Sequence, residues 1–501
     1  MNIAADIDIS ALPPRANAQD STQNKAINLI EACSMFARWS LADKNRLAQR
    51  AREFDLAPGE TLYERDDSAR GLYLVYSGCV KVAVMTDEGD EAIIDVVGNG
   101  QWFGELSIID GLTRQHSAIA LEHTSCIVLD SQLIESVLTA NPSLHREFSL
   151  LISKRLRDIF LWMEESLLNS VGAQIVKRLQ HIAMSVGTPH EDGVIIRALI
   201  SQDMLAAMLG ITRQTLNKEL GALKQEGLIK KIGRYYWIKS AATFSTSSNT
   251  GRLPIFSTSS FAQHAVFHCV ATPCNKKGAW AQRYVDNNPL FGRWTPADRE
   301  RLALSVQEFH LAPGQTLFER GACSKRLYFV IEGSLKGAVQ AEDGSEAIID
   351  VGAGGQWFGG LGIIDKQPSR QSVIALEETH CIAFSGTVIE SVLEQNPALY
   401  REISYLLCER LRAVFAQMET SLLKSIQDRV LTRLQRTALD AGTPHDGGYT
   451  IHSRISQDVL AGMLGITRQT LNKVLGQLKQ SGLVRKIGNR YWVSMSPTSS
   501  N

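Results

Sequence analysis

Two identical stretches of eleven residues carry side chains that suit the edges of nucleic-acid bases. Met208–Lys218 and Met463–Lys473 both read MLGITRQTLNK. An arginine can hold guanine O6 and N7 through two hydrogen bonds, and a glutamine can hold adenine N6 and N7 in the same way. Threonine and lysine side chains suit phosphate oxygens. The candidate DNA-contacting residues are Arg213, Gln214, Thr215, Asn217 and Lys218, and in the second stretch Arg468, Gln469, Thr470, Asn472 and Lys473.

The flanking residues predict the helices that would present these side chains. Thr212 can cap a helix over Arg213–Lys224, and Ser201 can cap a shorter helix before it. Gly210 supplies the turn between them. A helix, a glycine turn and a second helix form the helix-turn-helix arrangement, whose second helix enters the major groove by its N-terminal end. The apolar residues that would face the core are Leu205, Met208, Leu216, Leu220 and Leu223.

Local charge agrees with this interpretation. LIKKIGRYYWI, after the second helix, predicts a two-stranded wing with Gly233 in its turn. Arg197–Tyr235 contains 7 basic and 3 acidic residues, and His452–Arg490 contains 7 and 1, whereas the whole chain has 52 of each. Most charged helix faces are only solvated. Here the turn glycine, the base-reading side chains and the local positive charge coincide, which favours DNA binding.

The repeat extends well beyond the identical stretches. At a constant offset of 255 residues, Ile200–Asp203 (ISQD) returns at Ile455–Asp458, and Glu91–Val96 (EAIIDV) returns at Glu346–Val351. Shared composition cannot produce such agreement. The chain therefore contains a duplicated module of roughly 200 residues.

Length and composition limit the class of protein. At 501 residues, three to four domains are expected, and 44% hydrophobic and 21% charged residues are typical of a globular chain. No apolar run approaches about 18 residues, so no membrane partner is expected. The acidic start MNIAADIDIS does not look like a signal peptide. The 8 scattered cysteines suggest no disulfide framework, which predicts a reducing cytoplasm.

Each copy begins with short β-rich runs and continues with a long helix. From Phe36 to about Asp130, runs such as TLYERDD, RGLYLVYSG and QWFGELSII are separated by glycines, which predicts a compact barrel or jelly roll. From Pro142, apolar residues mostly four apart predict one long amphipathic helix. Its stripe comprises Leu144, Phe148, Ile152, Ile159, Met163 and Leu167, matched by Leu399, Ile403, Leu407, Val414, Met418 and Leu422. The stripe favours a helix partner, and the alternative is packing across its own barrel.

These patterns predict an α+β fold in which each copy has a β-roll, a long dimerisation helix and a winged helix-turn-helix. The Ser/Thr-rich segment between the copies reads as a linker that would let them meet. The expected boundaries are a flexible tail 1–25, β-roll 26–140, helix 141–170, winged domain 171–240, linker 241–285, β-roll 286–395, helix 396–425, winged domain 426–495 and tail 496–501.

The ordered motifs APGETLYERDD, YSGCVKV, GQWFGEL and GITRQTLNK resemble the bacterial cyclic AMP receptor protein/fumarate-nitrate regulator family. The resemblance covers about Phe36–Lys239 and Phe291–Ser494. It implies a sensing β-roll of the cyclic-nucleotide-binding type, a dimerising helix and a DNA-reading domain. Arg213, Gln214 and Lys218, with their repeats Arg468, Gln469 and Lys473, match the family's base- and phosphate-contacting positions.

The ligand pocket departs from the family pattern. The resemblance implies a Gly-Glu-Leu turn for the ribose hydroxyl and an Arg-Ser-Ala segment for the phosphate. The first copy keeps the turn but has His-Ser-Ala, and the second lacks both the glutamate and the arginine, so a cyclic phosphate loses its charged partner in both. Arg114 or Arg370 could substitute from nearby. The degenerate pocket residues are Gly104, Glu105, Leu106, His116, Ser117, Gly360, Gln371 and Ser372. We expect that cyclic AMP is not the effector of the second copy.

Other cofactors stay open. The N-terminal region offers only Cys33, so an iron–sulfur cluster is not supported. Haem-sensing relatives make His116 or His145 candidate ligands, although a lone histidine is more often structural. The linker residues His264, His268, Cys269 and Cys274 are metal-ligand types, but more often such a group is no site, and we predict no metal.

Three classes of function were weighed. The favoured one is a non-enzymatic transcriptional regulator that binds double-stranded DNA and RNA polymerase. Pairing of the two copies within one chain would make it a pseudo-dimer that reads a near-palindromic operator, and pairing between chains would make a homo-oligomer. The alternative is a tandem cyclic-nucleotide-binding-like sensor that acts on a protein partner. A β-roll enzyme would need a metal-binding His-x-His on a strand, which the chain lacks.

Overall fold

The computed structural model describes residues 19–86, 89–239, 279–323, 325–340, 346–451, 456–488 and 490–495. These residues form two compact units, each described by itself below. Unit 1 lies within Met1–Ile152, Asn169–Ser260 and Ile403–Leu423. Unit 2 lies within Ser153–Leu168, Phe261–Glu402 and Lys424–Asn501. Among the described helices, none has the length and apolar character needed to cross a bilayer.

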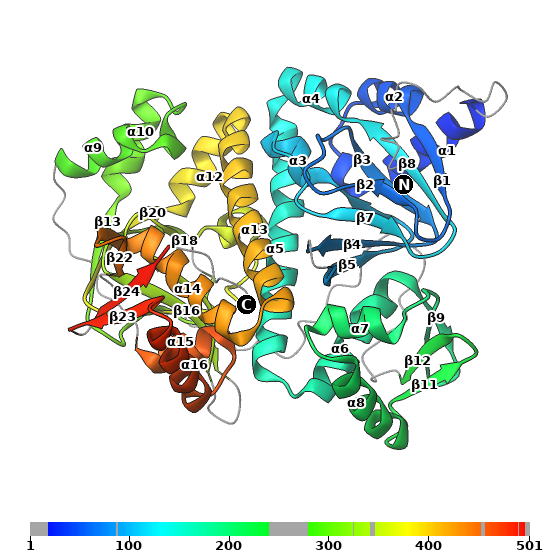
Figure 1. Cartoon of the computed structure of the whole chain (residues 1–501). Coiled ribbons are helices and arrows are strands. Elements are labelled where there is room, and N and C mark those ends of the chain that lie inside the picture. Colours follow the sequence, from blue (N-terminus) through cyan, green and yellow to red (C-terminus); the bar gives the residue numbers. More distant parts are fainter. Residues whose placement is uncertain are drawn as a thin grey trace. The chain divides into compact units, whose positions relative to one another are not determined.

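The first β-roll, in unit 1, consists of two four-stranded antiparallel sheets with the orders β1-β8-β3-β6 and β2-β7-β4-β5 (Figure 1). Its strands are β1 Arg52–Leu56, β2 Thr61–Tyr63, β3 Gly71–Ser77, β4 Val80–Met85, β5 Glu91–Val97, β6 Gln101–Phe103, β7 Ser117–Ala120 and β8 Thr124–Asp130. Phe54, Val75 and Phe103 from one sheet share a core with Val97 and Ala118 from the other. The predicted jelly roll is therefore confirmed.

The second β-roll, in unit 2, repeats this topology with the orders β13-β20-β15-β18 and β14-β19-β16-β17. Its strands are β13 Gln307–Leu311, β14 Thr316–Phe318, β15 Arg326–Glu332, β16 Ser334–Gln340, β17 Glu346–Ala353, β18 Trp357–Gly359, β19 Ser372–Ala375 and β20 Thr379–Ser385. Phe309, Tyr328 and Phe358 fill its core.

Helices cover the ends of both rolls, and they correct three predictions. They are α1 Gln19–Ala32, α2 Leu41–Arg50, α3 Glu105–Asp110 and α4 Ser131–Ala140, with α9 Ala279–Asn287, α10 Pro296–Ser305, α11 Leu361–Asp365 and α12 Gly386–Gln395 in the second copy. The tail prediction is wrong from Gln19 onward, because α1 buries Ala26 and Ile30 completely. The linker prediction is wrong from Ala279, where α9 buries Val285. The run QWFGELSII, predicted to be a strand with a turn, is strand only at β6, because the helix α3 follows the left-handed Gly104.

The predicted long helices are α5 His145–Leu168 and α13 Tyr400–Leu423, each entered through a short 3₁₀ turn that begins at a proline. Their apolar stripes are buried except at the last residues, Leu167 and Leu422, which are half-buried. The two helices are exchanged between the units. Ser153–Leu168 of α5 belongs to unit 2, with the second β-roll, and Ile403–Leu423 of α13 belongs to unit 1, with the first. The apolar stripe of each long helix is therefore not covered by the β-roll of its own copy alone.

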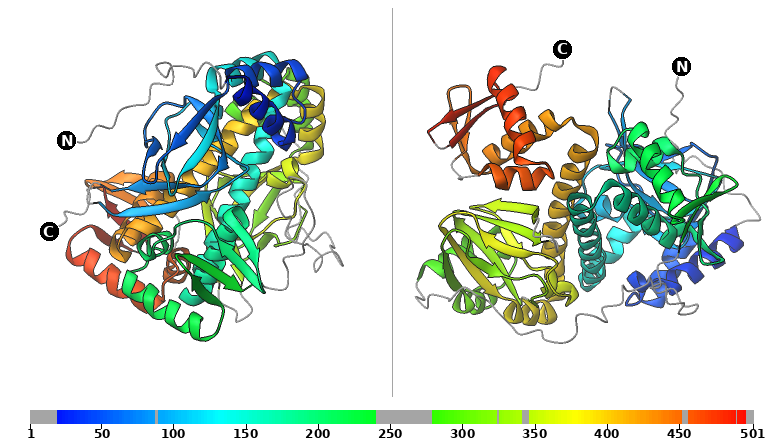
Figure 2. Two further views of the ribbon diagram at one scale, coloured as in Figure 1. Left: turned by 90° about the vertical axis from the view of Figure 1, so that its right-hand side faces the viewer. Right: turned by 90° about the horizontal axis from the view of Figure 1, so that it is seen from below.

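Each copy ends in a winged helix-turn-helix domain. The first contains α6 Val171–Val186, β9 Gly187–His190, β10 Gly193–Ile196, α7 Gln202–Leu209, α8 Arg213–Gln225, β11 Ile229–Ile232 and β12 Tyr235–Lys239. The second contains α14 Ile426–Ala441, β21 Gly442–His445, β22 Gly448–Ile451, α15 Gln457–Leu464, α16 Arg468–Gln480, β23 Val484–Ile487 and β24 Arg490–Ser494. The predicted strand pair is one half of a four-stranded sheet in each domain (Figure 2).

Each winged domain packs on the β-roll of its own copy. In unit 1, Ala83 and Ile93 of the roll belong to the same buried cluster as Leu205 and Leu216 of the winged domain. The buried Arg178 on α6 donates Nη2 to the carbonyl of Ile94 on β5, at 2.7 Å. In unit 2, Ile348 on β17 joins the corresponding cluster. A change in the roll can therefore reach the winged domain through packed side chains.

Candidate nucleic-acid interface

Side-chain caps set the start of both helices of the first helix-turn-helix. Ser201 Oγ accepts a hydrogen bond from the amide of Met204 at 3.0 Å, and Thr212 Oγ1 accepts one from the amide of Thr215 at 3.2 Å. Each bond satisfies an amide that would otherwise lack a partner at a helix start. Between the helices, Gly210 adopts φ 62°, in the left-handed region that glycine tolerates best. The predicted caps and turn are confirmed.

The second helix of the motif separates its two faces as expected. Leu216, Leu220 and Leu223 are buried on α8, and Leu471, Leu475 and Leu478 are buried on α16. The candidate DNA contacts in the first copy are all exposed. In the second copy Thr470 is half-buried and the other four are exposed. The described structure thus leaves these side chains accessible at the N-terminal half of each helix.

The arginine at the start of each helix has an internal partner that the sequence did not reveal. Arg213 Nη1 lies 3.1 Å from Asp203 on α7, and Arg468 Nη1 lies 3.3 Å from Asp458 on α15. Both pairs are well exposed, at 60% and 62% for the arginines, so they are weak and exchangeable. The repeated ISQD motif contains both aspartates and could have signalled the pair.

The wing carries further cations beside the motif. Lys230 Nζ lies 3.0 Å from Glu191, and it also lies 4.1 Å from the ring centre of Trp237. The hydrogen bond and charge of Lys230 lower the pKa of Glu191. Lys231 and Arg234 are exposed on the same hairpin, whose turn residue Gly233 has φ 60°. These cations can lie along a phosphate backbone.

The turn of each helix-turn-helix contacts the long helix of the other copy. Within unit 1, a Cβ on Gly210 would lie 3.2 Å from Leu422 Cα, at the end of α13. Within unit 2, a Cβ on Gly465 would lie 2.6 Å from Leu167 Cδ2, at the end of α5. Glycine at both turns, with positive φ and no side chain, suits this close approach. In each unit the turn of the helix-turn-helix is therefore packed directly on a helix of 24 residues.

In the first roll, Arg114 occupies the predicted pocket region. It is 3% exposed, and its guanidinium donates to the carbonyls of Gly104 at 2.6 Å and Gly71 at 2.7 Å. Its guanidinium carbon also lies 4.5 Å from the ring centre of Tyr63 and 5.5 Å from that of Tyr73. The guanidinium thus has internal partners on several sides, which argues against its predicted use as a phosphate ligand.

His116 contacts the exchanged helix. Its Nε2 lies 3.1 Å from Glu419 on α13, and its ring meets Phe415 edge-on at 4.7 Å between ring centres. Arg65 also pairs with Glu419, at 3.2 Å. Burial opposes ionisation of Glu419, but the hydrogen bonds and charges of His116 and Arg65 outweigh it and lower the pKa of this carboxyl. The residue at the family's phosphate-arginine position is thus tied to the other copy.

The remaining pocket positions have structural partners. Ser117 Oγ accepts a hydrogen bond from the amide of Arg65 at 2.9 Å, and Ser372 Oγ accepts one from Arg320 at 3.0 Å. Glu105 is 4% exposed and begins α3. In the second roll, Gly360 caps α11 with φ 82°.

Leu106, on α3, is half-buried. Gln371 accepts at its carbonyl from Ser369 Oγ at 2.8 Å. Burial lowers the pKa of Arg370, the residue before it. In each roll an arginine adjoins the serine of the pocket through its backbone amide, since Arg65 bonds Ser117 and Arg320 bonds Ser372.

Two matching ion pairs join the exchanged helices to the rolls. In unit 1, Arg412 on α13 donates to both carboxylate oxygens of Asp110 on α3, at 2.6 and 3.0 Å. In unit 2, Arg157 on α5 pairs in the same way with Asp365 on α11. Such two-point pairs fix both distance and orientation. Sequence analysis did not find them, because each joins residues more than 200 positions apart.

Two winged helix-turn-helix domains, each joined to a β-roll and a long helix, define a DNA-binding transcriptional regulator. The cyclic nucleotide-binding domain model matches residues 53–141 and 308–396, and the Crp-like helix-turn-helix domain model matches residues 173–243 and 428–495. The chain is a tandemly duplicated member of the cyclic AMP receptor protein/fumarate-nitrate regulator family.

Three of the similar proteins each match a length of this chain that corresponds to one copy. A CRP-like cAMP-activated global transcriptional regulator of Mycobacterium tuberculosis is 25% identical over 188 residues, covering 38% of this chain and 84% of the relative. The cyclic AMP receptor protein of Thermus thermophilus is 28% identical over 176 residues, covering 34% and 76%. The structure of FixK2 from Bradyrhizobium japonicum is 20% identical with a TM-score of 0.35, covering 38% of this chain and 93% of that one.

Two further predictions concern candidate metal and haem ligands. The linker residues His264, His268, Cys269 and Cys274 lie outside the described residues. His145, the other haem candidate, is 7% exposed at the start of α5, where its carbonyl accepts a hydrogen bond from Ser149 Oγ at 3.0 Å. Neither finding assigns a ligand.

Proposed function

We propose that the chain regulates transcription as a single-chain pseudo-dimer that reads two nearly identical half-sites of one operator. The observation that carries this proposal is the reciprocal exchange of the long helices. Arg412 ties α13 to the first roll, and Arg157 ties α5 to the second. An exchange of this kind supports pairing of the two copies within one polypeptide. Pairing between separate chains in a homo-oligomer would not require the long helices to be exchanged within one chain.

The recognition residues define what the operator should look like. We assign base contacts to Arg213 and Gln214 and phosphate contacts to Thr215 and Lys218, with Asn217 beside them on the exposed face. The second copy has the same five residue types, so both half-sites should have nearly the same sequence. If the two helices enter successive major grooves, the half-site centres lie about 10 base pairs apart or a multiple of that.

The effector of the first roll, in this proposal, is not cyclic AMP. His116 stands where the family places its phosphate-binding arginine, and its imidazole is already joined to Glu419. A ligand that disturbs this contact would act directly on α13, whose end packs on the turn at Gly210. RNA polymerase is the expected protein partner, because the family regulates transcription.

Selection of bound duplexes from random DNA tests the proposal. The full chain should enrich a two-fold-related pair of half-sites, and Arg213→Ala/Arg468→Ala should abolish the enrichment. Loss of one two-point contact to guanine corresponds to about 1–3 kcal/mol, or roughly 5- to 150-fold in affinity, at each half-site. The matched control is Arg38→Ala/Arg293→Ala, which removes the same charge from equally exposed and equally repeated positions.

Mass measurement of the complex separates pairing within a chain from pairing between chains. One 55.2 kDa chain on each operator is the expected result. An obligate particle of two chains would refute the pseudo-dimer while leaving DNA recognition intact. If neither the native chain nor the control variant enriched any sequence, sequence-specific binding would be refuted. That result would favour a sensor that acts on a protein partner.

A further inference from the structure

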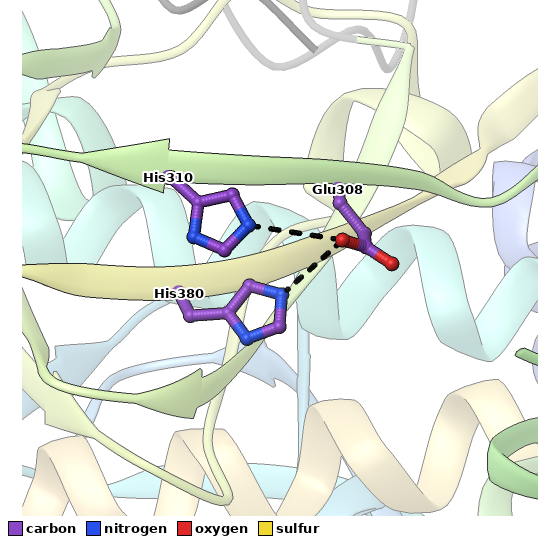
Figure 3. A group of neighbouring side chains, drawn as sticks. All are labelled: Glu308, His310 and His380. Atoms are coloured by element: carbon purple, nitrogen blue, oxygen red, sulfur yellow. Dashed lines mark ion pairs between the residues drawn. The ribbon is translucent and has the colours of Figure 1, made fainter. Parts of the chain in front are cut away.

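Potential metal ligands converge on one outer face of the second β-roll, remote from the DNA-facing motif in the sequence. Glu308 and His310 lie two residues apart on β13, and His380 lies on β20 (Figure 3). One ligand atom from each of the three lies within 4.8 Å of the others. We propose that these residues form a binding site for a divalent transition-metal ion of the Zn²⁺ class.

The strand register places the three side chains on the same face. His310 pairs directly with His380 across β13 and β20. Alternation along a strand puts Glu308 on the same side as His310. The two imidazole rings stack at 4.4 Å between centres with an interplanar angle of 11°, and each presents Nε2 toward the Glu308 carboxylate (Figure 3). Two strands of a rigid sheet therefore hold the donor atoms.

The three residues do not satisfy one another. Glu308 Oε2 lies 3.7 Å from His310 Nε2 and 3.8 Å from His380 Nε2, which is longer than the roughly 2.7–3.2 Å of a hydrogen bond. His380 Nε2 is buried and forms no hydrogen bond within the described part of the chain. A buried nitrogen without a partner is unfavourable unless something else binds it. The geometry leaves room for an ion between the donors.

The distances suit a small ion after a slight adjustment. Zn²⁺ binds histidine nitrogen and carboxylate oxygen at about 2.0–2.2 Å, which puts tetrahedral ligand atoms roughly 3.3 Å apart. The two carboxylate–imidazole distances of 3.7 and 3.8 Å would have to shorten by about half an ångström to reach this spacing.

The donor set also favours a transition metal over Ca²⁺ or Mg²⁺. Imidazole nitrogen suits Zn²⁺, Ni²⁺, Co²⁺ and Cu²⁺, whereas Ca²⁺ and Mg²⁺ prefer oxygen ligands. Glu332 on β15 pairs in register with His380 and adds an acidic group on that row of the sheet. Two histidines and one carboxylate leave at least one coordination position for water or for Glu332.

The first copy provides an internal comparison. At the positions 255 residues earlier, Glu53 is kept, but Asp55 replaces His310 and Ser125 replaces His380. There, Ser125 Oγ donates to Asp55 at 2.6 Å, and Glu53 pairs with Lys25 at 2.9 Å, so the polar groups satisfy one another. The same strand register thus accepts aspartate and serine without a metal. Only the second copy has the nitrogen donors.

Zinc binding to the full chain tests the proposal. After removal of metal with a chelator, Zn²⁺ is titrated by calorimetry, and Co²⁺ is used as a spectroscopic probe. The key variant is His310→Asp/His380→Ser, which installs the residues of the first copy and therefore should fold. A second variant is Glu308→Gln, which keeps the size of the side chain. Circular dichroism checks the fold of both.

We expect one Zn²⁺ per chain from this site, with binding weakened about a hundredfold or more in His310→Asp/His380→Ser and at least about tenfold in Glu308→Gln. Bound Co²⁺ should show visible bands without the near-ultraviolet absorption of sulfur ligands. The control, His264→Ala/His268→Ala/Cys269→Ser/Cys274→Ser, should bind Zn²⁺ at this site unchanged. Three results would overturn the proposal. They are full zinc binding by His310→Asp/His380→Ser, loss of zinc binding in the control, and no zinc binding by the native chain.

Discussion

The buried ion pair between Arg412 and Asp110 offers a direct test of the helix exchange. The arginine side chain is 18% exposed and the aspartate 7%, and two hydrogen bonds join them. Removing one partner of a buried pair leaves an uncompensated charge, at about 3–5 kcal/mol, whereas an exposed pair contributes about 0–1 kcal/mol. We expect Arg412→Ala to destabilise α3 by about 3 kcal/mol, the lower end of that range, because Arg412 keeps some contact with water.

Hydrogen exchange measured by mass spectrometry reports this change locally. A loss of about 3 kcal/mol corresponds to roughly 150-fold faster exchange of the amides in and after α3. The double variant Arg412→Ala/Asp110→Asn should lose much less, because no charge is left buried and an asparagine can still accept from the amide of Leu112, as Asp110 does at 3.0 Å. Arg157→Ala should produce the same effect on α11 in unit 2 and leave α3 unchanged.

Two results would refute this reasoning. If Arg412→Ala accelerated exchange at α3 by less than about fivefold, the pair would behave like an exposed surface pair, and α13 would not be held against the first roll in solution. If the single and double variants lost equal protection, the uncompensated charge on Asp110 would not be the cause. Arg38→Ala, which removes an arginine of unit 1 whose side chain is 60% exposed, serves as the control for removal of an arginine.

Three further predictions concern acid stability, backbone conformation and DNA affinity. Because the folded-state pKa of Glu419 is lowered, this carboxyl stabilises fully above the ordinary glutamate pKa of about 4.3, and its contribution is lost as pH falls through the lowered value. In Glu419→Gln, the free energy of unfolding should therefore fall less steeply as the pH is lowered through this range. Gly210→Ala should lower the free energy of unfolding in urea by about 1–2 kcal/mol, since φ is positive there, whereas Gly221→Ala, inside α8 with open space around it, should raise it by about 0.5–1 kcal/mol. Asp203→Ala should strengthen operator binding severalfold in fluorescence anisotropy, because it frees Arg213 and removes a negative charge near phosphate, and should change stability by less than about 1 kcal/mol.

The parts of the molecule that depend on local signals could be predicted from the sequence. Ser201 and Thr212 cap their helices as expected, and Gly210 makes the turn, because a cap or a left-handed residue acts within three or four positions of itself. The leucine spacing on α8 likewise showed which face is exposed. The constant offset of 255 residues revealed the duplication without any structural information.

The sequence also misled where local composition was ambiguous. The polar segment before Lys25 looked like a tail, but two buried residues, Ala26 and Ile30, are enough to hold α1 on the roll. The run that begins at Gln101 looked like a strand with a turn, whereas the left-handed Gly104 ends β6 and a helix, α3, follows it. At α1 a few tertiary contacts outweighed the average character of the segment, and at α3 a single glycine did.

Only the tertiary structure decided which surfaces meet. An apolar stripe on α13 indicates that one face is buried, but not that the first roll helps to cover it, so the contact of His116 with Glu419, 303 residues away, has no local signature. The convergence of Glu308, His310 and His380 depends on the register between β13 and β20, which are separated by most of a β-roll. Periodicity and capping are properties of neighbouring residues, whereas partner choice and register are set by the packing of the whole chain.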